Sequence, residues 1–161
     1  MQECQRVVLL KKFMANMKIN FKIVTPEKTV FESEIDQATL PVADGEVTIL
    51  PNHRSYIAAL KAGEICLKKD GEEIIMATSG GFIEFHDNSL VVLADTAERA
   101  EEIDLKRAEE AKVRAEEAMK QKESMDNAEY ARVAAAIEKE MARLRVGKKH
   151  RTKKGININN E

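Results

Sequence analysis

The residue types change abruptly after Asp95, and this change divides the chain into two parts with different expected folds. Up to Asp95, short apolar runs alternate with turn residues, which is typical of β-structure. After Asp95, glycine and proline are absent until Gly147, and the helix-favouring residues Ala, Glu, Lys and Arg dominate. The sequence therefore predicts an α+β protein with an N-terminal β-domain and a C-terminal helical region.

The first part has the period-2 alternation of β-strands. Ile19, Phe21 and Ile23 alternate with polar residues before Thr25-Pro26 ends the run. Later runs of the same kind occupy residues 64–68, 73–78, 81–85 and 89–94. The turns between them are supplied by Asp44-Gly45, Asp70-Gly71 and His86-Asp87-Asn88. Such closely spaced strands, with no helix between most of them, indicate an antiparallel sandwich or a flattened barrel.

The second part has two apolar stripes at helical spacing. The first consists of Leu105, Ala108, Ala111, Ala115 and Ala118, and the second of Tyr130, Ala134, Ile137, Met141 and Leu144. Asp126 and Glu129 form a capping box that begins the second helix, and Gly147 is expected to end it. Because the first stripe is mostly alanine, the hairpin buries little apolar area. It is either a permanently packed appendage or an element that can leave its partner.

Composition excludes several classes of protein and favours a cytoplasmic one. The 26 basic and 28 acidic side chains nearly cancel in 161 residues, so the chain as a whole is not drawn to nucleic acid or anionic lipid. Cys4 and Cys66 are isolated, which indicates a reducing compartment. No apolar run approaches the roughly 20 residues of a membrane span. We interpret residues 1–16 as an N-terminal extension and not as a secretory signal.

Residues that could carry out chemistry are sparse. His53, His86 and His150 lie far apart and have no Cys or His at ligand spacing, so no metal site is expected. Thr78-Ser79-Gly80-Gly81 lacks the pattern of a phosphate-binding P-loop and is expected to be a backbone bend. Cys66 has no candidate base beside it. These features argue against an enzyme.

Three stretches carry a resemblance to a known family. They are residues 45–64 (GEVTILPNHRSYIAALKAGE), 80–104 (GGFIEFHDNSLVVLADTAERAEEID) and 129–146 (EYARVAAAIEKEMARLRV). They resemble the epsilon subunit of bacterial F-type ATP synthases, and the resemblance extends from Met17 to Val146. It implies a noncatalytic central-stalk subunit that couples the catalytic head to the c-ring during proton- or sodium-driven ATP synthesis. Such a protein is peripheral to the cytoplasmic face of the inner membrane.

The resemblance also implies that different segments of the chain have different roles. Residues 17–101 are expected to form an antiparallel β-sandwich of about ten strands that binds the gamma subunit and the c-ring. Residues 102–146 are expected to form a regulatory hairpin of two antiparallel helices. When extended, this hairpin meets the alpha and beta subunits of the catalytic head and inhibits ATP hydrolysis. Residues 147–161 are expected to be a basic, disordered tail.

Particular residues acquire roles through the same resemblance. Glu46 and His53 correspond to c-ring contacts, although an exposed glutamate beside a glycine is equally typical of a solvated turn. The resemblance assigns the inhibitory contact to basic residues of the second helix. The alternative is that these residues simply form a solvated face of the helix. These residues are Arg132, Lys139, Arg143 and Arg145.

A nucleotide-binding motif of some family members, [IL]-D-x-x-R-A, is matched from Ile103 to Ala108. It is carried by Ile103, Asp104, Arg107 and Ala108, and further matching positions are Glu98, Arg114 and Arg143. Lys139 stands where strong ATP binders have arginine, so weak binding is expected. Asp104 is equally explained as a helix N-cap. No cofactor is required, and weakly bound regulatory ATP is the one ligand that the resemblance implies.

The alternative is an adaptor unrelated to the synthase, with a basic tail that binds RNA or acidic lipid. Its support is the sequence KKHRTKKG at residues 148–155. Aromatic residues, which stack on bases in single-strand-binding modules, make up only 4% of the chain. We therefore expect no nucleic-acid partner.

Overall fold

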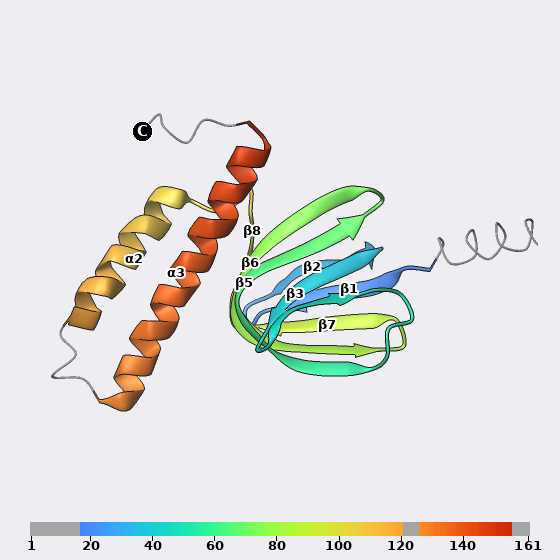
Figure 1. The fold of residues 1–161 in the computed structure, drawn as a ribbon, viewed down its shortest axis with the longest axis horizontal. Coiled ribbons are helices and arrows are strands. Elements are labelled where there is room, and N and C mark those ends of the chain that lie inside the picture. The colour runs from blue at the N-terminus through green and yellow to red at the C-terminus, as the bar shows by residue number, and fades with distance from the viewer. Residues whose placement is uncertain (1–16, 121–125, 156–161) are drawn as a thin grey trace, which may run out of the picture.

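The computed structural model describes residues 17–120 and 126–155, which form a β-sandwich followed by two packed helices (Figure 1). The strands are β1 (Ile19–Val24), β2 (Thr29–Ile35), β3 (Gln37–Val42), β4 (Gly45–Ile49), β5 (Tyr56–Lys69), β6 (Glu72–His86), β7 (Ser89–Ala94) and β8 (Ala97–Arg99). The helices are α2 (Leu105–Lys120) and α3 (Asn127–Lys153). The predicted α+β class, with a sandwich followed by a helical pair, is confirmed.

The described part of the chain has eight strands and not about ten, because two strands are unusually long. β5 has 14 residues and β6 has 15, and they pair from Tyr56 with Phe85 to Lys69 with Glu72. The runs predicted at residues 73–78 and 81–85 are both parts of β6. Gly80 and Gly81, with φ of 137° and 132°, join them as a bend within the strand. A Cβ at Gly81 would lie 2.0 Å from the Leu93 carbonyl oxygen, so only glycine fits there.

The strand order is β2-β1-β7-β6-β5-β3-β4, and β8 pairs with β6. All neighbouring strands are antiparallel except β1 and β7, whose parallel pairing local sequence periodicity did not reveal. Two reversals have the backbone of tight hairpin turns. Asp70 and Gly71 both have positive φ, as do Asp87 and Asn88, in agreement with the turns predicted at these positions.

The core of the sandwich is built from the predicted alternation. Ile19, Phe21 and Ile23 of β1 are at most 1% exposed, while the residues between them face outward. They pack with large side chains from the other strands, including Ile35, Leu40, Ile65, Leu67, Met76, Ile83, Phe85 and Leu90. The sandwich therefore has a continuous apolar interior of its own.

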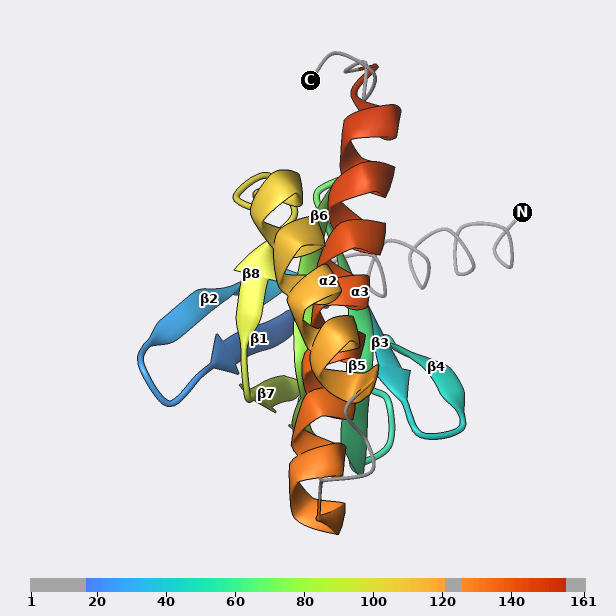
Figure 2. The same ribbon diagram turned by 90° about the vertical axis from the view of Figure 1, so that its left-hand side faces the viewer.

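A second, smaller cluster joins the helices to the outer side of β6. It consists of Ile75, Ala77, Ala100, Ile103, Leu105, Ala108, Leu144 and Val146. α3 packs against α2 and also against β5 and β6, so the hairpin lies folded on the sandwich (Figures 1 and 2). The stripe predicted for α2 contains its least exposed apolar residues near the helix start, Leu105 and Ala108.

Both helix starts agree with the sequence. Asp104 accepts a hydrogen bond from the Arg107 backbone N–H at 3.1 Å, and Asp126 accepts one from the Glu129 N–H at 2.7 Å. The buried face of α3 differs from the predicted stripe, because this helix contacts both α2 and the sheet. Met141 is 43% exposed, while Glu140, Ala142 and Val146 are buried.

The prediction that Gly147 ends the second helix is wrong. α3 continues to Lys153, so residues 147–153 are helical and are not the start of a disordered tail. A Cβ on Gly147 would lie 2.6 Å from Leu105 Cδ2 and 3.2 Å from Ile103 Cγ2. The glycine thus permits close packing between α3 and the segment that begins α2. The predicted extension at 1–16, with Cys4, and residues 156–161 lie outside the described residues.

Candidate nucleotide pocket and partner surfaces

A cavity of about 630 Å³ lies between the two helices and the edge of the sandwich that carries β8. β8, α2 and α3 are seen together in Figure 2. The cavity brings together five of the predicted nucleotide residues, namely Glu98, Arg107, Arg114, Lys139 and Arg143. They come from β8, α2 and α3, so this site exists only while the hairpin is folded.

The other three residues of the predicted site have structural positions. Ile103 and Ala108 are buried in the cluster between hairpin and sheet, at 4% and 0% exposure. The Asp104 side chain caps α2 through the Arg107 backbone N–H. None of the three lines the cavity. They fix the start of α2, and that start positions Arg107 at the cavity wall.

Arg143 is the most strongly held cation of the cavity. Its Nε donates to Glu98 Oε2 at 2.8 Å and its Nη2 to Glu98 Oε1 at 3.3 Å, so Arg143 and Glu98 form a two-pronged pair between α3 and β8. Burial alone would lower the pKa of Arg143, but hydrogen bonds from its guanidinium to Glu98 and Glu140 outweigh burial and raise it. The guanidinium is therefore charged at every relevant pH.

The remaining cations of the cavity are less constrained. Arg114 pairs loosely with Glu110 of the same helix at 3.9 Å. Within residues 17–120 and 126–155, neither the Arg107 side chain nor Lys139 forms an ion pair. Five basic and four acidic side chains line the cavity, and sequence reasoning missed the acidic residues Glu27, Glu102 and Glu140. Glu140 precedes Arg143 by three residues on α3, and this i,i+3 spacing is the sequence signal that could have indicated their ion pair.

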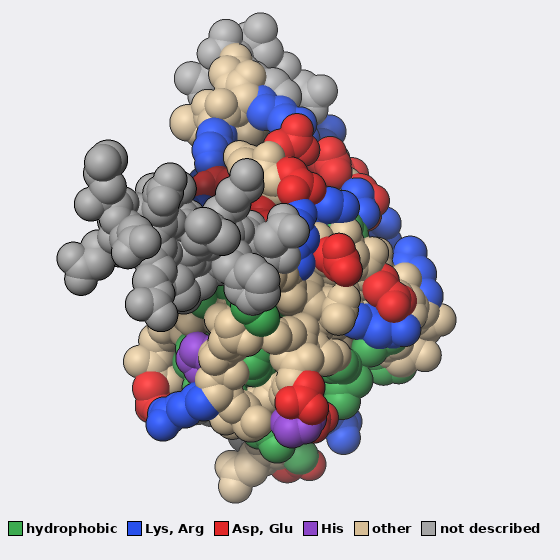
Figure 3. All heavy atoms as spheres, turned by 90° about the vertical axis from the view of Figure 1, so that its right-hand side faces the viewer, with side chains coloured by type: hydrophobic (Ala, Val, Ile, Leu, Met, Phe, Trp, Pro, Cys, Tyr) green, Lys and Arg blue, Asp and Glu red, His purple; other side chains and the backbone are tan. Residues whose placement is uncertain are grey.

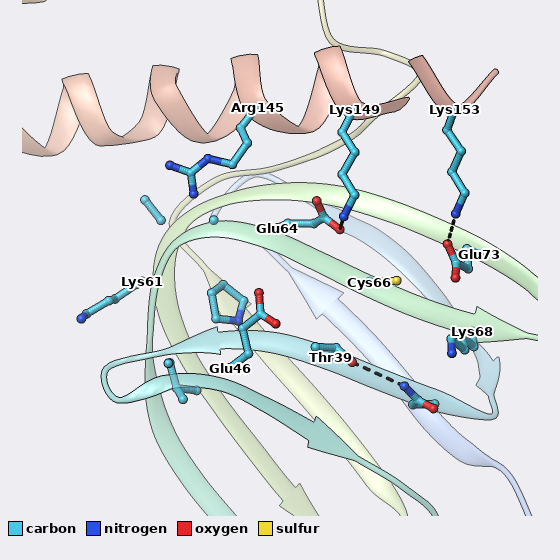
Figure 4. Close-up of a pocket in the computed structure, with 16 residues that line it drawn as sticks. Thr39, Glu46, Lys61, Glu64, Cys66, Lys68, Glu73, Arg145, Lys149 and Lys153 are labelled. Atoms are coloured by element: carbon cyan, nitrogen blue, oxygen red, sulfur yellow. Dashed lines mark hydrogen bonds and ion pairs between the residues drawn. The ribbon is translucent and has the colours of Figure 1, made fainter. Parts of the chain in front are cut away.

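A second cavity, of about 780 Å³, lies on the other side of α3, above β3 to β6. Figure 4 shows Arg145, Lys149 and Lys153 reaching from α3 toward it. Lys149 Nζ pairs with Glu64 Oε1 at 2.7 Å, and Lys153 pairs with Glu73. Burial raises the pKa of the Cys66 thiol in this cavity, and Glu73 and Glu64 add to that effect, so the thiol stays protonated.

The four basic residues predicted to inhibit do not share one surface in the folded hairpin. Arg132 is exposed on the first turns of α3, and Lys139 and Arg143 line the smaller cavity. Arg145 faces the larger cavity. Release of α3 from the sandwich would be needed to make all four available to one partner.

The two predicted c-ring contacts lie near opposite ends of β4. Glu46 is exposed near the first residue of the strand and lines the larger cavity (Figure 4). His53 follows the strand and is half-buried. Its ring packs edge-on against Tyr56 and Phe85, with centroids 6.1 and 5.9 Å away, and its Nδ1 lies 2.9 Å from the Arg54 carbonyl oxygen. The histidine therefore orders the turn that holds it.

An apolar surface on the outer face of β5, β6 and β7 was not anticipated from the sequence. Ile57, Phe82 and Leu93 are 73%, 61% and 57% exposed. Phe82 stands opposite Ala59 on one side and Leu93 on the other, so the three large side chains share one face. The side of the sandwich turned away from the helices also carries exposed hydrophobic side chains among charged ones (Figure 3).

No group of three or more metal-ligating side chains comes together within residues 17–120 and 126–155. In the same ranges, no helix is both long and apolar enough to cross a membrane.

Comparison with known proteins matches both parts of the chain. Residues 18–100 match the family model of the ATP synthase delta/epsilon chain β-sandwich domain. Residues 101–148 match the model of the delta/epsilon chain long α-helix domain. The last part of α3, with Lys149 and Lys153, lies beyond the matched residues.

Individual proteins agree with the family models. The ATP synthase epsilon chain of Dehalococcoides mccartyi is 45% identical over 138 residues, which cover 86% of this chain and 96% of the relative. That of Herpetosiphon aurantiacus is 41% identical over 137 residues, covering 85% and 99%. A chain in the cryo-EM structure of Euglena gracilis mitochondrial ATP synthase has the same fold, with a TM-score of 0.65 and 22% identity over 79% of this chain and 81% of that chain. This chain therefore belongs to the family of ATP synthase epsilon chains, which are noncatalytic central-stalk subunits.

Proposed function

We propose that this protein is a rotor subunit with two separable tasks. The β-sandwich couples the catalytic head to the c-ring during ion-driven ATP synthesis, and the helical hairpin restrains ATP hydrolysis when it leaves the sandwich. The observation that carries the second task is the position of the basic residues of α3. In the folded state Lys139 and Arg143 line one cavity and Arg145 lines another, so hairpin release would expose them together.

The sandwich offers three surfaces for partners. Ile57, Phe82 and Leu93 form the apolar surface that we assign to the gamma subunit, because exposed apolar patches typically mark protein contacts. We assign the beginning of β4 with Glu46, and the turn ordered by His53, to the c-ring. These contacts would place the protein at the cytoplasmic face of the inner membrane.

The cavity between β8 and the helices is the proposed site for regulatory ATP. Arg107, Arg114, Lys139 and Arg143 supply positive charge toward a triphosphate. Because α2, α3 and β8 all contribute, ATP would bind only the folded hairpin and would shift the population away from the inhibitory state. The size of this shift is limited by the difference in affinity between the two states.

Truncation tests the inhibitory role. We expect deletion of residues 126–161 to raise ATP hydrolysis by the assembled catalytic head at least about twofold, because the extended population that blocks rotation is lost. Assembly with gamma should be unchanged, since the apolar surface is retained. Deletion of residues 154–161 alone is the control, because it leaves all of α3 and should not change the rate.

The inhibitory role would be disproved by equal hydrolysis rates of the truncated and full-length complexes while cross-linking shows the full-length hairpin extended. Substituting alanine for Arg132, Lys139 and Arg143 should reproduce part of the effect of the deletion. High salt should weaken inhibition in the full-length complex if exposed ion pairs contribute to it.

A further inference from the structure

Arg143 is held between two carboxylates at the wall of the smaller cavity. Besides its two hydrogen bonds to Glu98, its Nη1 donates to Glu140 Oε2 at 2.9 Å. The side chains of Arg143, Glu98 and Glu140 are 17%, 30% and 12% exposed. Three of the five N–H groups of the guanidinium are therefore committed to protein carboxylates.

This arrangement is unusual for a site that binds a polyphosphate. Two carboxylates and one guanidinium leave the group with one net negative charge, which repels a triphosphate in the same cavity. The repulsion acts over a short distance in a partly buried site, where solvent screens charges poorly. Arg143 can serve a phosphate only with the two N–H groups that remain, or after a carboxylate leaves.

Glu140 and Glu98 differ in the element that carries them. Glu98 lies on β8 and ties the hairpin to the sandwich through its paired contact with Arg143. Glu140 is on α3 itself, one helical turn before Arg143, so their pair joins no two elements. Within the described residues Glu140 has Arg143 as its hydrogen-bonding partner and contributes no other tie. Its carboxylate is thus the less necessary of the two for holding the folded hairpin.

We propose that Glu140 is an internal competitor for nucleotide phosphate, which occupies Arg143 and sets a low affinity of the cavity for ATP. The inference rests on the proposed nucleotide site and identifies the residue that limits it. Weak ATP binding then has two causes. One is Lys139 in the place of an arginine, and the other is the negative charge of Glu140 within hydrogen-bonding distance of Arg143. A substitution of Glu140 can remove this charge without adding a new contact.

Calorimetry on the full-length protein with ATP and AMP tests the proposal. Glu140→Gln keeps the size of the side chain and removes its charge, so ATP should bind about five- to tenfold more tightly. The gain should be much smaller for AMP, because the repulsion acts on phosphate charge; a merely structural effect would change both ligands alike. Glu138→Gln is the matched control, since Glu138 is exposed on the same helix and lies outside this cavity.

The outcomes separate this inference from the site on which it rests. Tighter ATP binding by Glu140→Gln and Glu140→Ala, with Glu138→Gln equal to wild type, supports the competitor role. Unchanged or weaker ATP binding by both Glu140 variants overturns it, even if Arg107→Ala lowers wild-type affinity about tenfold and so upholds the nucleotide site. If wild type, Glu140→Gln and Glu140→Ala all fail to bind ATP at millimolar concentration, the proposed site and the competitor role are both wrong.

Discussion

The sandwich and the hairpin are stabilised in different ways. The largest fully buried side chains, such as Phe21, Phe85 and Met76, all belong to the sandwich. The cluster beneath the hairpin contains three alanines among its eight residues, and ion pairs at exposed or half-buried positions surround it. Since apolar burial supplies most folding free energy and exposed ion pairs supply little, the hairpin is the less stable unit. We therefore expect release of α3 from the sandwich to require less free energy than unfolding of the sandwich.

A core substitution should show the largest effect. Phe21 is 1% exposed, so Phe21→Ala should lower the free energy of unfolding of the sandwich by about 3–5 kcal/mol. Denaturant titration measures the loss. Phe82→Ala removes the same atoms from a side chain that is 61% exposed, and should change stability by less than about 0.5 kcal/mol. Similar losses in the two variants would mean that Phe21 does not belong to a tightly packed core.

The next effect should fall on the hairpin alone. Gly147→Val would force side-chain atoms into Leu105 and Ile103, and such overpacking typically costs about 1–3 kcal/mol. We expect amide hydrogen exchange to accelerate in α2 and α3 while the amides of β1 and β7 keep their protection. Ala136→Val is the control for the low helix propensity of valine, because Ala136 is exposed on the same helix. Equal acceleration in both variants would refute the close packing at Gly147.

Local sequence signals predicted those features that depend on a few neighbouring residues. The alternation of apolar and polar residues predicted which residues of β1 are buried. The side chains of Asp104 and Asp126 predicted the helix starts, and the Asp70-Gly71 pair predicted a tight turn. The same signals led to the wrong helix end at Gly147. A glycine after an apolar stripe is typical of a helix end, and only its contact with Leu105 reveals close packing instead.

The candidate site was predicted incompletely for the same reason. Motif resemblance indicated Arg107 and Arg143, and the structure brings both to one cavity. Glu140 was missed, because a glutamate on a helix rich in charges is usually solvated and only the fold buries it beside Arg143. The apolar surface around Phe82 was missed because the alternation that marks a strand does not say which residues of a bent strand face solvent.

A smaller effect is expected from the lysines at the end of α3. Lys149 and Lys153 pair with Glu64 and Glu73, but both lysines are more than half exposed, so each pair should contribute only about 0.2–1 kcal/mol. Replacing both lysines with methionine should increase the exchange rate of α3 amides a few-fold, and added salt should have less effect on the variant than on wild type. Lys106→Met with Lys154→Met is a control with the same change of charge, since both lysines are exposed and neither forms an ion pair within residues 17–120 and 126–155. An equal response of the two double variants would show that net charge alone matters.

The smallest effect is the pH dependence of the Lys153–Glu73 contact. The hydrogen bond from Lys153 lowers the pKa of Glu73 below its ordinary value of 4.5. A carboxyl group whose pKa is lower in the folded state contributes stability at pH above its unfolded pKa, and this contribution is lost as the pH falls through the folded pKa. The contribution of this contact to hairpin docking should thus be constant from neutral pH to about 4.5 and decrease at lower pH. Below pH 4.5, the exchange rates of α3 amides, corrected for the pH dependence of intrinsic exchange, should therefore increase. Glu73→Gln removes the titrating group.

The α3 exchange rate of this variant should therefore depend less on pH below 4.5 than that of wild type. Because Glu73 is exposed, solvent screening keeps the difference between the two proteins small. Identical profiles for wild type and Glu73→Gln below pH 4.5 would show that this contact does not help to hold the hairpin on the sandwich.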